Sequence, residues 1–209
     1  MTTTLLLYNQ ALMHLGQRKL ASTSEDQEGR YYLDEIYSDT LSYCLRQGLW
    51  NFAMIEAEIA STTTPTIHYS YGIAKPAAWV RTHTISDNES FNPPLLDYLD
   101  IGVYWYADVS PIYVRYVGTT AGTNVSLFPV DYADYVASML ASRIYKRITG
   151  NGEDDLAAFE RRKVRPALRR AMANDAMDQP PEFAPTGSWV RARGGDNNSE
   201  RGNRSSLIG

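Results

Sequence analysis

Hydrophobic residues recur at spacings of three and four along the first part of the chain, as they do on the buried face of a helix. One such stretch covers residues 5–15 and ends at Gly16, a residue suited to the left-handed C-terminal cap of a helix. A second stretch covers residues 25–45. The connection between them is short, so the pattern predicts an antiparallel helical hairpin over residues 1–50 with its apolar faces in contact.

The second stretch carries signals at both of its ends. Ser24 is followed three residues later by Gln27, which fits a capping box, and acidic residues around them suit the positive end of a helix dipole. At the other end the apolar spacing stops near Gly48. We therefore expect this helix to begin at Ser24 and to stop near Gly48.

Residues 51–59 fit two patterns. Alternate residues are apolar, which is typical of a strand, while Phe52, Ile55 and Ile59 would also share one face of a helix. We favour the strand, because the chain beyond it is rich in Tyr, Val, Ile, Thr and Trp, in short runs separated by Pro and Gly. The sequence predicts a small antiparallel β module over residues 51–128, with about four to six short strands.

Helical spacing returns after the β module. Pro129 suits the first turn of a helix, and small and apolar residues then recur up to Gly150. A further helix begins near residue 153 with a cluster of acidic residues, and Pro166 is expected to bend or interrupt it. Two long helices over residues 129–178 thus complete the predicted bundle.

Beyond residue 178 the composition changes to Pro, Gly, Asn and Arg without periodicity, and such a segment cannot bury enough apolar surface to fold alone. It nevertheless contains Phe183 and Trp189, the type of side chain with which a tail anchors to a partner. The predicted fold class is α+β, mainly α. It consists of an antiparallel helix bundle with an inserted small antiparallel β module and an extended C-terminal arm over residues 179–209.

The average charge of the chain hides an asymmetry. The 209 residues are 44% hydrophobic, enough for a core, and carry a formal net charge of -4. Residues 1–136 hold 7 Lys and Arg against 15 Asp and Glu, whereas residues 137–209 hold 13 against 9. The acidic balance argues against a protein that mainly wraps nucleic acid. In a ring of identical copies, opposite charges would let neighbouring subunits meet.

The sequence contains no recognisable catalytic motif. Its three histidines, His14, His68 and His83, are not spaced as metal ligands with one another or with the single Cys44, which we expect to be a reduced, packed thiol. There is no Gly-rich phosphate loop, GxSxG elbow, kinase signature or zinc-protease signature. We predict no catalytic residues, no metal and no cofactor, and therefore no enzyme.

Targeting signals are equally scarce. No apolar stretch has the length needed to span a bilayer, and the Leu run at 5–7 lacks the basic flank and cleavage site of a signal peptide. We expect a protein made in a cytosol that does not interact with membranes.

The basic run between residues 161 and 170 allows two interpretations. It can be a solvated helix face, or it can contact DNA phosphates or the acidic face of a partner. A binding module that contacts nucleic acid through this helix is the alternative function. The residues concerned are Arg161, Arg162, Lys163, Arg165, Arg169 and Arg170. The aromatic run at 104–106 has the same two kinds of interpretation, packing in a sheet or an interface.

The stretch LRQGLWNFAMIE, residues 45–56, lies where the predicted hairpin meets the β module. We expect Gly48 to end the hairpin and Trp50 and Phe52 to fill the junction between helices and sheet. Trp50 is thus predicted to be a core residue.

Taken in order, these segments resemble the head-to-tail adaptor proteins of bacteriophages, the family that includes the tail tubular protein A of short-tailed phages. The resemblance covers roughly residues 5–178, and it is carried by the order and spacing of hydrophobic motifs. These motifs are ALMHLGQRKLAS, LRQGLWNFAMIEAEIA, YSYGIAKPAAWVR, VYWYAD and FPVDYADYVASMLASRI, followed by a final helix and a Pro-rich tail.

The resemblance implies a structural virion protein of the head-tail junction, made in the bacterial host cytoplasm. Such proteins form a ring of about a dozen copies between the portal and a tail tube or nozzle protein, with a channel through which double-stranded DNA passes. The basic run would then lie at a subunit interface or at the DNA channel. The C-terminal segment would be a portal-docking arm, with anchors and charged contacts at Phe183, Trp189, Arg191 and Arg193.

Overall fold

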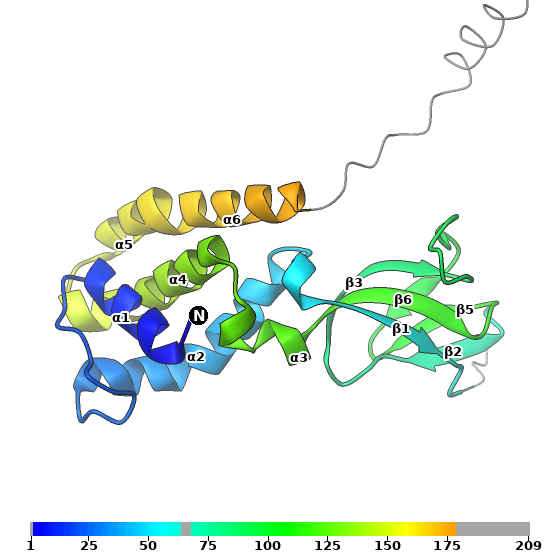
Figure 1. Cartoon of the computed structure of the whole chain (residues 1–209), viewed down its shortest axis with the longest axis horizontal. Coiled ribbons are helices and arrows are strands. Elements are labelled where there is room, and N and C mark those ends of the chain that lie inside the picture. The colour runs from blue at the N-terminus through cyan, green and yellow to red at the C-terminus, as the bar shows by residue number, and fades with distance from the viewer. Residues whose placement is uncertain (1, 64–67, 179–209) are drawn as a thin grey trace, which may run out of the picture. The chain divides into compact units, whose positions relative to one another are not determined.

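Helices form both ends of the described chain, and strands lie between them (Figure 1). The computed structural model describes residues 2–63 and 68–178. The longer helices are α1 (Thr4–His14), α2 (Glu28–Arg46), α4 (Val130–Thr149), α5 (Glu153–Phe159) and α6 (Arg165–Met177). Shorter helical segments are η1 (Asn51–Ala53), α3 (Thr119–Gly122), η2 (Val125–Leu127) and the π-helical η3 (Glu160–Val164). The strands are β1 (Met54–Ile59), β2 (Tyr71–Ala74), β3 (Trp79–Ser86), β4 (Leu99–Ile101), β5 (Tyr104–Ala107) and β6 (Ile112–Gly118).

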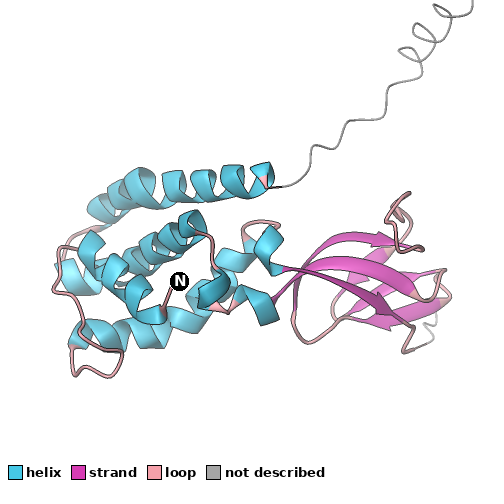
Figure 2. Ribbon diagram, in the orientation of Figure 1, coloured by secondary structure: helices cyan, strands magenta, loops and turns pink. Residues whose placement is uncertain are grey.

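The balance of elements confirms the predicted fold class. Helices account for about 49% of the structure and strands for about 19%. The strands form two small antiparallel sheets, and all of them lie between α2 and α4 in the chain (Figure 2). The fold is therefore α+β, mainly α, with an inserted β module. The predicted C-terminal arm lies outside the described residues.

The central helix of the bundle is α4, on which α1, α2 and α6 all pack. Its buried face includes Ala133, Ala137 and Ala141, whose small side chains allow other helices to come close. By contrast, α1 and α2 touch each other at few points, such as the edge-to-face pair of Tyr8 and Tyr37 with ring centroids 5.6 Å apart. Both apolar faces are buried mainly against α4, so the direct contact between the two helices of the predicted hairpin is small.

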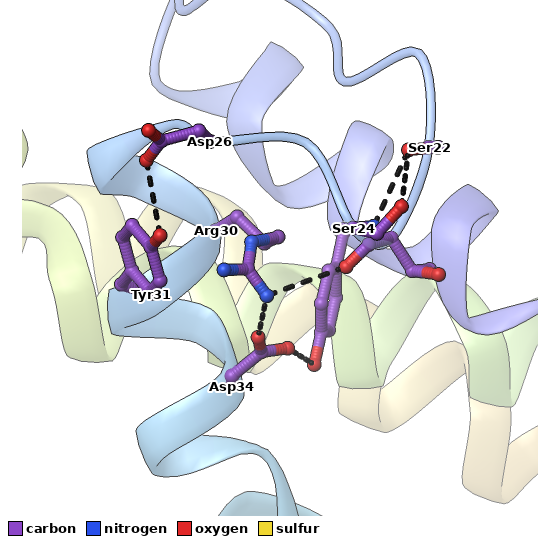
Figure 3. A network of polar contacts seen from close by, with 8 residues as sticks. Ser22, Ser24, Asp26, Arg30, Tyr31 and Asp34 are labelled. Carbon is purple, nitrogen blue, oxygen red and sulfur yellow. Dashed lines mark hydrogen bonds and ion pairs between the residues drawn. The ribbon is translucent and has the colours of Figure 1, made fainter.

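The connection between α1 and α2 is longer than predicted, and α2 begins at Glu28. The predicted capping box is wrong, because Gln27 is the N-cap and makes no side-chain cap bond. Ser24 interacts instead with Ser22 (Figure 3). The loop is held by Asn9 of α1, whose amide donates to the Leu20 carbonyl at 3.1 Å and accepts from the Leu20 N–H at 2.7 Å.

A polar network fastens α1 and this loop to the start of α2 (Figure 3). The Tyr8 hydroxyl donates to Asp34 at 2.8 Å, and the Arg30 guanidinium donates to the other Asp34 oxygen at 2.7 Å. Arg30 also reaches the Thr23 carbonyl in the loop. Burial, followed by the Asp34 hydrogen bond, raises the pKa of the Tyr8 phenol, so this hydroxyl remains a donor at neutral pH.

Helix ends match the sequence signals in part. Gly16 follows α1 with φ of 70°, in the left-handed region that the sequence predicted, and Gly150, the predicted end of α4, caps it with φ of 68°. Helix α2 ends at Arg46 with Gln47 as its C-cap, so it stops near Gly48, as expected. Pro129 is the N-cap of α4, one residue before the first turn.

The helix that contains Pro166 is interrupted, as predicted. Between α5 and α6 the chain passes through the π-helical segment Glu160–Val164, and Pro166 lies in the first turn of α6. The wider turn comes directly before Pro166 because a proline ring and its missing N–H prevent regular bonding to the preceding turn. The expected single long helix is thus made of three consecutive helical segments.

The β module has a core of its own. One sheet has the order β1-β6-β3 and the other β2-β5-β4, with every pairing antiparallel. Strand β1 confirms the strand interpretation for residues 54–59. Buried side chains fill the interior of the module, namely Ile73, Ile85, Trp105, Ile112, Val114 and Tyr116. Trp105 is fully buried, as the packing interpretation requires, whereas Tyr104 and Tyr106 are half-buried.

Candidate interaction surfaces

The basic run forms an exposed face along η3 and α6. All six Lys and Arg side chains are exposed, while Val164, Ala167 and Ala171 point into the helical core. The apolar residues lie at spacings of three and four, so the basic ones are left on the solvent side. The structure thus groups on one helical edge the six residues that the sequence indicated as a set.

Few of these six cations form an ion pair with a carboxylate of the described chain. Among the described residues, only Arg170 of the six has an ion-pair partner, Asp134, at 4.0 Å. Arg161 donates to the Ala157 carbonyl, which leaves its charge uncompensated. A cluster of like charges with so few counterions among the described residues attracts anions or an acidic surface. The geometry therefore favours a contact surface over a merely solvated face.

An acidic face runs along α2, which the sequence analysis did not single out. Tyr31, Glu35, Asp39 and Tyr43 are all exposed, at spacings that place them on the solvent side of the helix. Within the described part of the chain, Glu35 and Asp39 form no ion pair and no hydrogen bond. We call these four residues the α2 face.

Trp50 lies in the helical core, next to the start of the β module. Its side chain is only 1% exposed, and its indole Nε1 donates to the Cys44 carbonyl at 3.1 Å. The ring centroid lies 4.7 Å from that of Tyr132, which in turn lies 4.7 Å from Phe52. Val117 of β6 belongs to the same core. The placement agrees with the junction role expected for Trp50 and Phe52.

Besides following the end of α2, Gly48 makes room for the Trp50 ring. A Cβ atom at this position would lie 2.9 Å from Cε2 of Trp50, closer than side chains normally come. Glycine is therefore required so that the Trp50 ring can fold back over the backbone.

The end of α6 is tied to the same junction. The carboxylate of Asp175 accepts two bonds from the Asn51 N–H, at 2.9 and 3.2 Å, and the Asn51 amide donates to the Asp175 carbonyl at 2.6 Å. Burial raises the pKa of Asp175, against the lowering effect of the Asn51 bond. A cavity of about 180 Å³ lies beside this contact and is lined in part by Trp50 and Tyr132.

A charge cluster with a buried lysine joins the two sheets of the β module. The Lys75 side chain is 5% exposed, its Nζ lies 2.5 Å from Asp100, and it sits 3.9 Å from the centre of the Trp79 ring. The Thr82 hydroxyl accepts from the indoles of Trp79 and Trp105, each at 3.1 Å, and donates to Asp100. Because every polar atom in this cluster has a partner, we interpret it as structural.

The β module also exposes an apolar edge. Strand β4 pairs with β5 alone among the described strands, and its residues are exposed. Around it Leu96 is 86% exposed, Val103 66% and Ile101 55%. An edge strand with apolar side chains offers both free backbone groups and apolar surface. This surface differs in chemistry from the charged helical faces.

The histidines do not form a site. His14 is packed at the end of α1, where burial lowers its pKa, and its Nε2 lies 3.8 Å from Asp134. His68 and His83 are exposed. Over residues 2–63 and 68–178, no three His, Cys, Asp or Glu side chains come together in a way that could hold a metal ion. No helix in the same ranges has the length and apolarity that crossing a membrane requires.

The comparisons with known proteins give no assignment. Neither the protein-family models nor the curated protein sequences yield a match to this chain. The predicted arm residues Phe183, Trp189, Arg191 and Arg193 lie outside the described residues.

Sequence reasoning missed two of these surfaces. The α2 face was not singled out, although residues 35 and 39 share a helix face by spacing alone. The apolar edge at β4 was hidden because Leu99 and Ile101 alternate like the residues of a half-buried strand. Only the strand order shows that this strand lies at an edge.

Proposed function

We propose that this chain is a structural virion protein, a head-to-tail adaptor that forms an oligomeric ring between a phage portal and its tail. In the manner of the resembled family, the ring would be dodecameric, with about a dozen copies around a channel for the genome. Its partners would be further copies of itself, the portal, and a tail tube or nozzle protein. The proposal rests on the resemblance in the order of the sequence motifs.

The structural observation that supports it best is the insertion of a β module with its own core into a helical body. Strands β1 and β6, which begin and end the module, pair with each other from Met54 opposite Val117 to Ile59 opposite Ile112. The chain therefore leaves the helices and returns to them on adjacent strands. Such an arrangement gives one subunit two surfaces, one on the helical body and one on the β module. An adaptor between two different partners requires two such surfaces.

The chemistry of the surfaces is consistent with this role. The helical body carries charged faces, whereas the β module exposes the apolar edge around β4. Two partners of different composition would thus meet different kinds of surface. The cavity beside Trp50, lined largely by residues already paired or packed, does not suggest a substrate site.

The test measures the mass of the purified protein in solution, alone and with its cognate portal. It compares the full chain with a chain truncated after Asp178. We expect the full chain to form a closed multi-subunit ring on the portal. If the truncated chain forms no ring on the portal, the residues beyond 178 are needed for docking on the portal. A full chain that stays monomeric with excess portal would refute the proposal.

A second candidate function is favoured by the exposed basic face. Five of its six cations lack an ion-pair partner among the described residues, so the monomer would contact DNA through phosphates. This function would be supported if the monomer binds a DNA duplex and the logarithm of the binding constant falls steeply as the logarithm of the salt concentration rises. An adaptor ring needs only weak contact, because DNA must slide through its channel.

A further inference from the structure

A ring of identical subunits needs two different faces on each copy that fit each other. If one face of a subunit binds a different face of its neighbour, the contact repeats and either closes into a ring or continues as a filament. The two faces must lie on different sides of the subunit, since otherwise a third copy could not be added. Opposite charges on such faces would select the correct pairing.

The basic face supplies one candidate surface. Arg165 and Arg169 lie four residues apart on α6, and Met172, also exposed, continues the same side of the helix. Arg and Met are both enriched at protein interfaces. The basic face thus combines unpaired charge with exposed apolar surface.

The α2 face supplies the complementary surface. It carries two carboxylates without partners in the described chain, Glu35 and Asp39, between the exposed rings of Tyr31 and Tyr43. The cations nearest to it are already engaged: Arg30 pairs with Asp34, and Arg143 lies over the Tyr43 ring. Tyrosine is among the residues most enriched at interfaces.

The two faces lie on opposite sides of the helical body. Both α2 and α6 pack on α4, and Figures 1 and 2 show them on either side of it. One subunit can therefore use its basic face toward one neighbour and its α2 face toward another. This is the geometry that a heterologous contact requires.

We infer that the occupant of the basic face is the α2 face of a second copy, in a head-to-tail contact that repeats around the ring. This inference rests on the proposed function and names the lateral surfaces that the ring would use. Arg165 and Arg169 of one copy would face Glu35 and Asp39 of the next. Because such charges are screened by salt, ring formation should weaken as ionic strength rises above about 0.1 M, where the Debye length is about 10 Å.

The test uses two full-length variants. In the first, Arg165→Glu and Arg169→Glu reverse the basic face, and in the second, Glu35→Lys and Asp39→Lys reverse the α2 face. Each variant alone would set like charges against each other at every contact, so half-maximal assembly on the portal should need at least about 100-fold more protein.

Mixing the two variants is the decisive step. The reversed face of each variant matches the reversed face of the other, and the two unchanged faces match as well. An equimolar mixture should therefore form rings in which the variants alternate, at close to the native concentration. Native mass spectrometry would report equal numbers of the two chains in each ring.

The control is Glu58→Lys with Glu89→Lys, which makes the same change of charge as the α2-face variant, on exposed residues of the β module. It should assemble like the native chain. Circular dichroism and urea unfolding of each variant would show that the fold is retained.

The outcomes separate this inference from the proposed function. If the native chain forms rings and both single-face variants do so equally well, the lateral contact is wrong while the adaptor function stands. If the variants fail alone and also in the mixture, the faces serve other partners and the pairing is wrong. If reversal of the basic face abolishes DNA binding and leaves assembly unchanged, nucleic acid is the occupant. If the native chain forms no ring on the portal, the proposed function itself fails.

Discussion

Replacing Trp50 with alanine tests the junction between the helical core and the β module. The indole is 1% exposed, packs against Tyr132 at a centroid distance of 4.7 Å, and donates to the Cys44 carbonyl at 3.1 Å. Its removal would leave a large hole next to a cavity of about 180 Å³ that already exists there. The surrounding aromatic rings belong to rigid helices and cannot close such a space fully.

The expected loss follows from these contacts. Truncation of a buried Trp or Phe to Ala costs about 3–5 kcal/mol of unfolding free energy, through lost burial and the cavity that remains. The lost hydrogen bond adds little, because the Cys44 carbonyl keeps the Gln47 N–H at 3.2 Å and is not left unpaired. Trp50→Phe retains most of the ring and should cost only about 1–2 kcal/mol.

The assay is urea unfolding followed by circular dichroism at one temperature, for the native chain, both Trp50 variants and Leu96→Ala. Leu96 is 86% exposed, so its truncation should change the unfolding free energy by less than about 0.5 kcal/mol. If Trp50→Ala unfolds within about 1 kcal/mol of the native chain, Trp50 is not a core residue of the junction and the reasoning fails.

Three further predictions concern the same region. Gly48→Ala should lower the unfolding free energy by about 1–3 kcal/mol, because its methyl group would meet Trp50 Cε2 at 2.9 Å; an unchanged urea midpoint would contradict this. Burial raises the pKa of the Asp175 carboxyl in the folded chain, so the folded chain binds a proton there more strongly than the unfolded chain does. The unfolding free energy of the native protein should therefore rise relative to that of Asp175→Asn as the pH falls from 7 through the raised pKa. Unfolding free energies at neutral and mildly acidic pH measure this gain, and a difference between the two chains that does not vary with pH would oppose it. Burial also raises the pKa of Cys44 to about 12, so iodoacetamide should label this single thiol at about pH 8 only after urea unfolds the chain, and rapid labelling of the native protein would show that the thiol is accessible.

The elements of the fold were predictable because each leaves a local pattern. The apolar spacing that ends at Gly16 and at Gly150 gave two helix ends, and the alternation after Phe52 gave β1. Pro166 marked the interruption before α6 because its missing N–H is a property of one residue. Such signals are confined to a few neighbours, which is why sequence alone can detect them.

The partners of the helices could not be predicted in the same way. A periodic apolar face shows that a helix is buried on one side, but it does not identify what buries it. The short connection favoured a hairpin, whereas Asn9 holds Leu20 in a long loop that lets both helices turn toward α4. The false capping box at Ser24 has the same origin, since Ser22 competes for its hydroxyl only in the folded loop.

The candidate surfaces were predictable to different degrees. The basic run lies within ten positions, and the apolar residues Val164, Ala167 and Ala171 recur at helical spacing within and just after it, so the basic residues were bound to face solvent once the segment proved helical. The carboxylates of α2 are spread over a longer helix with few cations near them in the sequence. Whether Glu35 and Asp39 remain unpaired depends on contacts with α4, and only the three-dimensional packing decides that.

The position of α4 explains how a chain with a net charge of -4 can carry two opposed charged faces. The acidic first part of the sequence supplies α2, the basic last part supplies α6, and α4 packs between both helices. The uneven distribution of charge along the sequence thereby becomes a difference in charge between two sides of the helical body. If both faces lay on one side, their charges would neutralise each other within the subunit. Their separation leaves most of the charges of both faces without a partner among the described residues, and a repeated contact between copies, as proposed above, would compensate both.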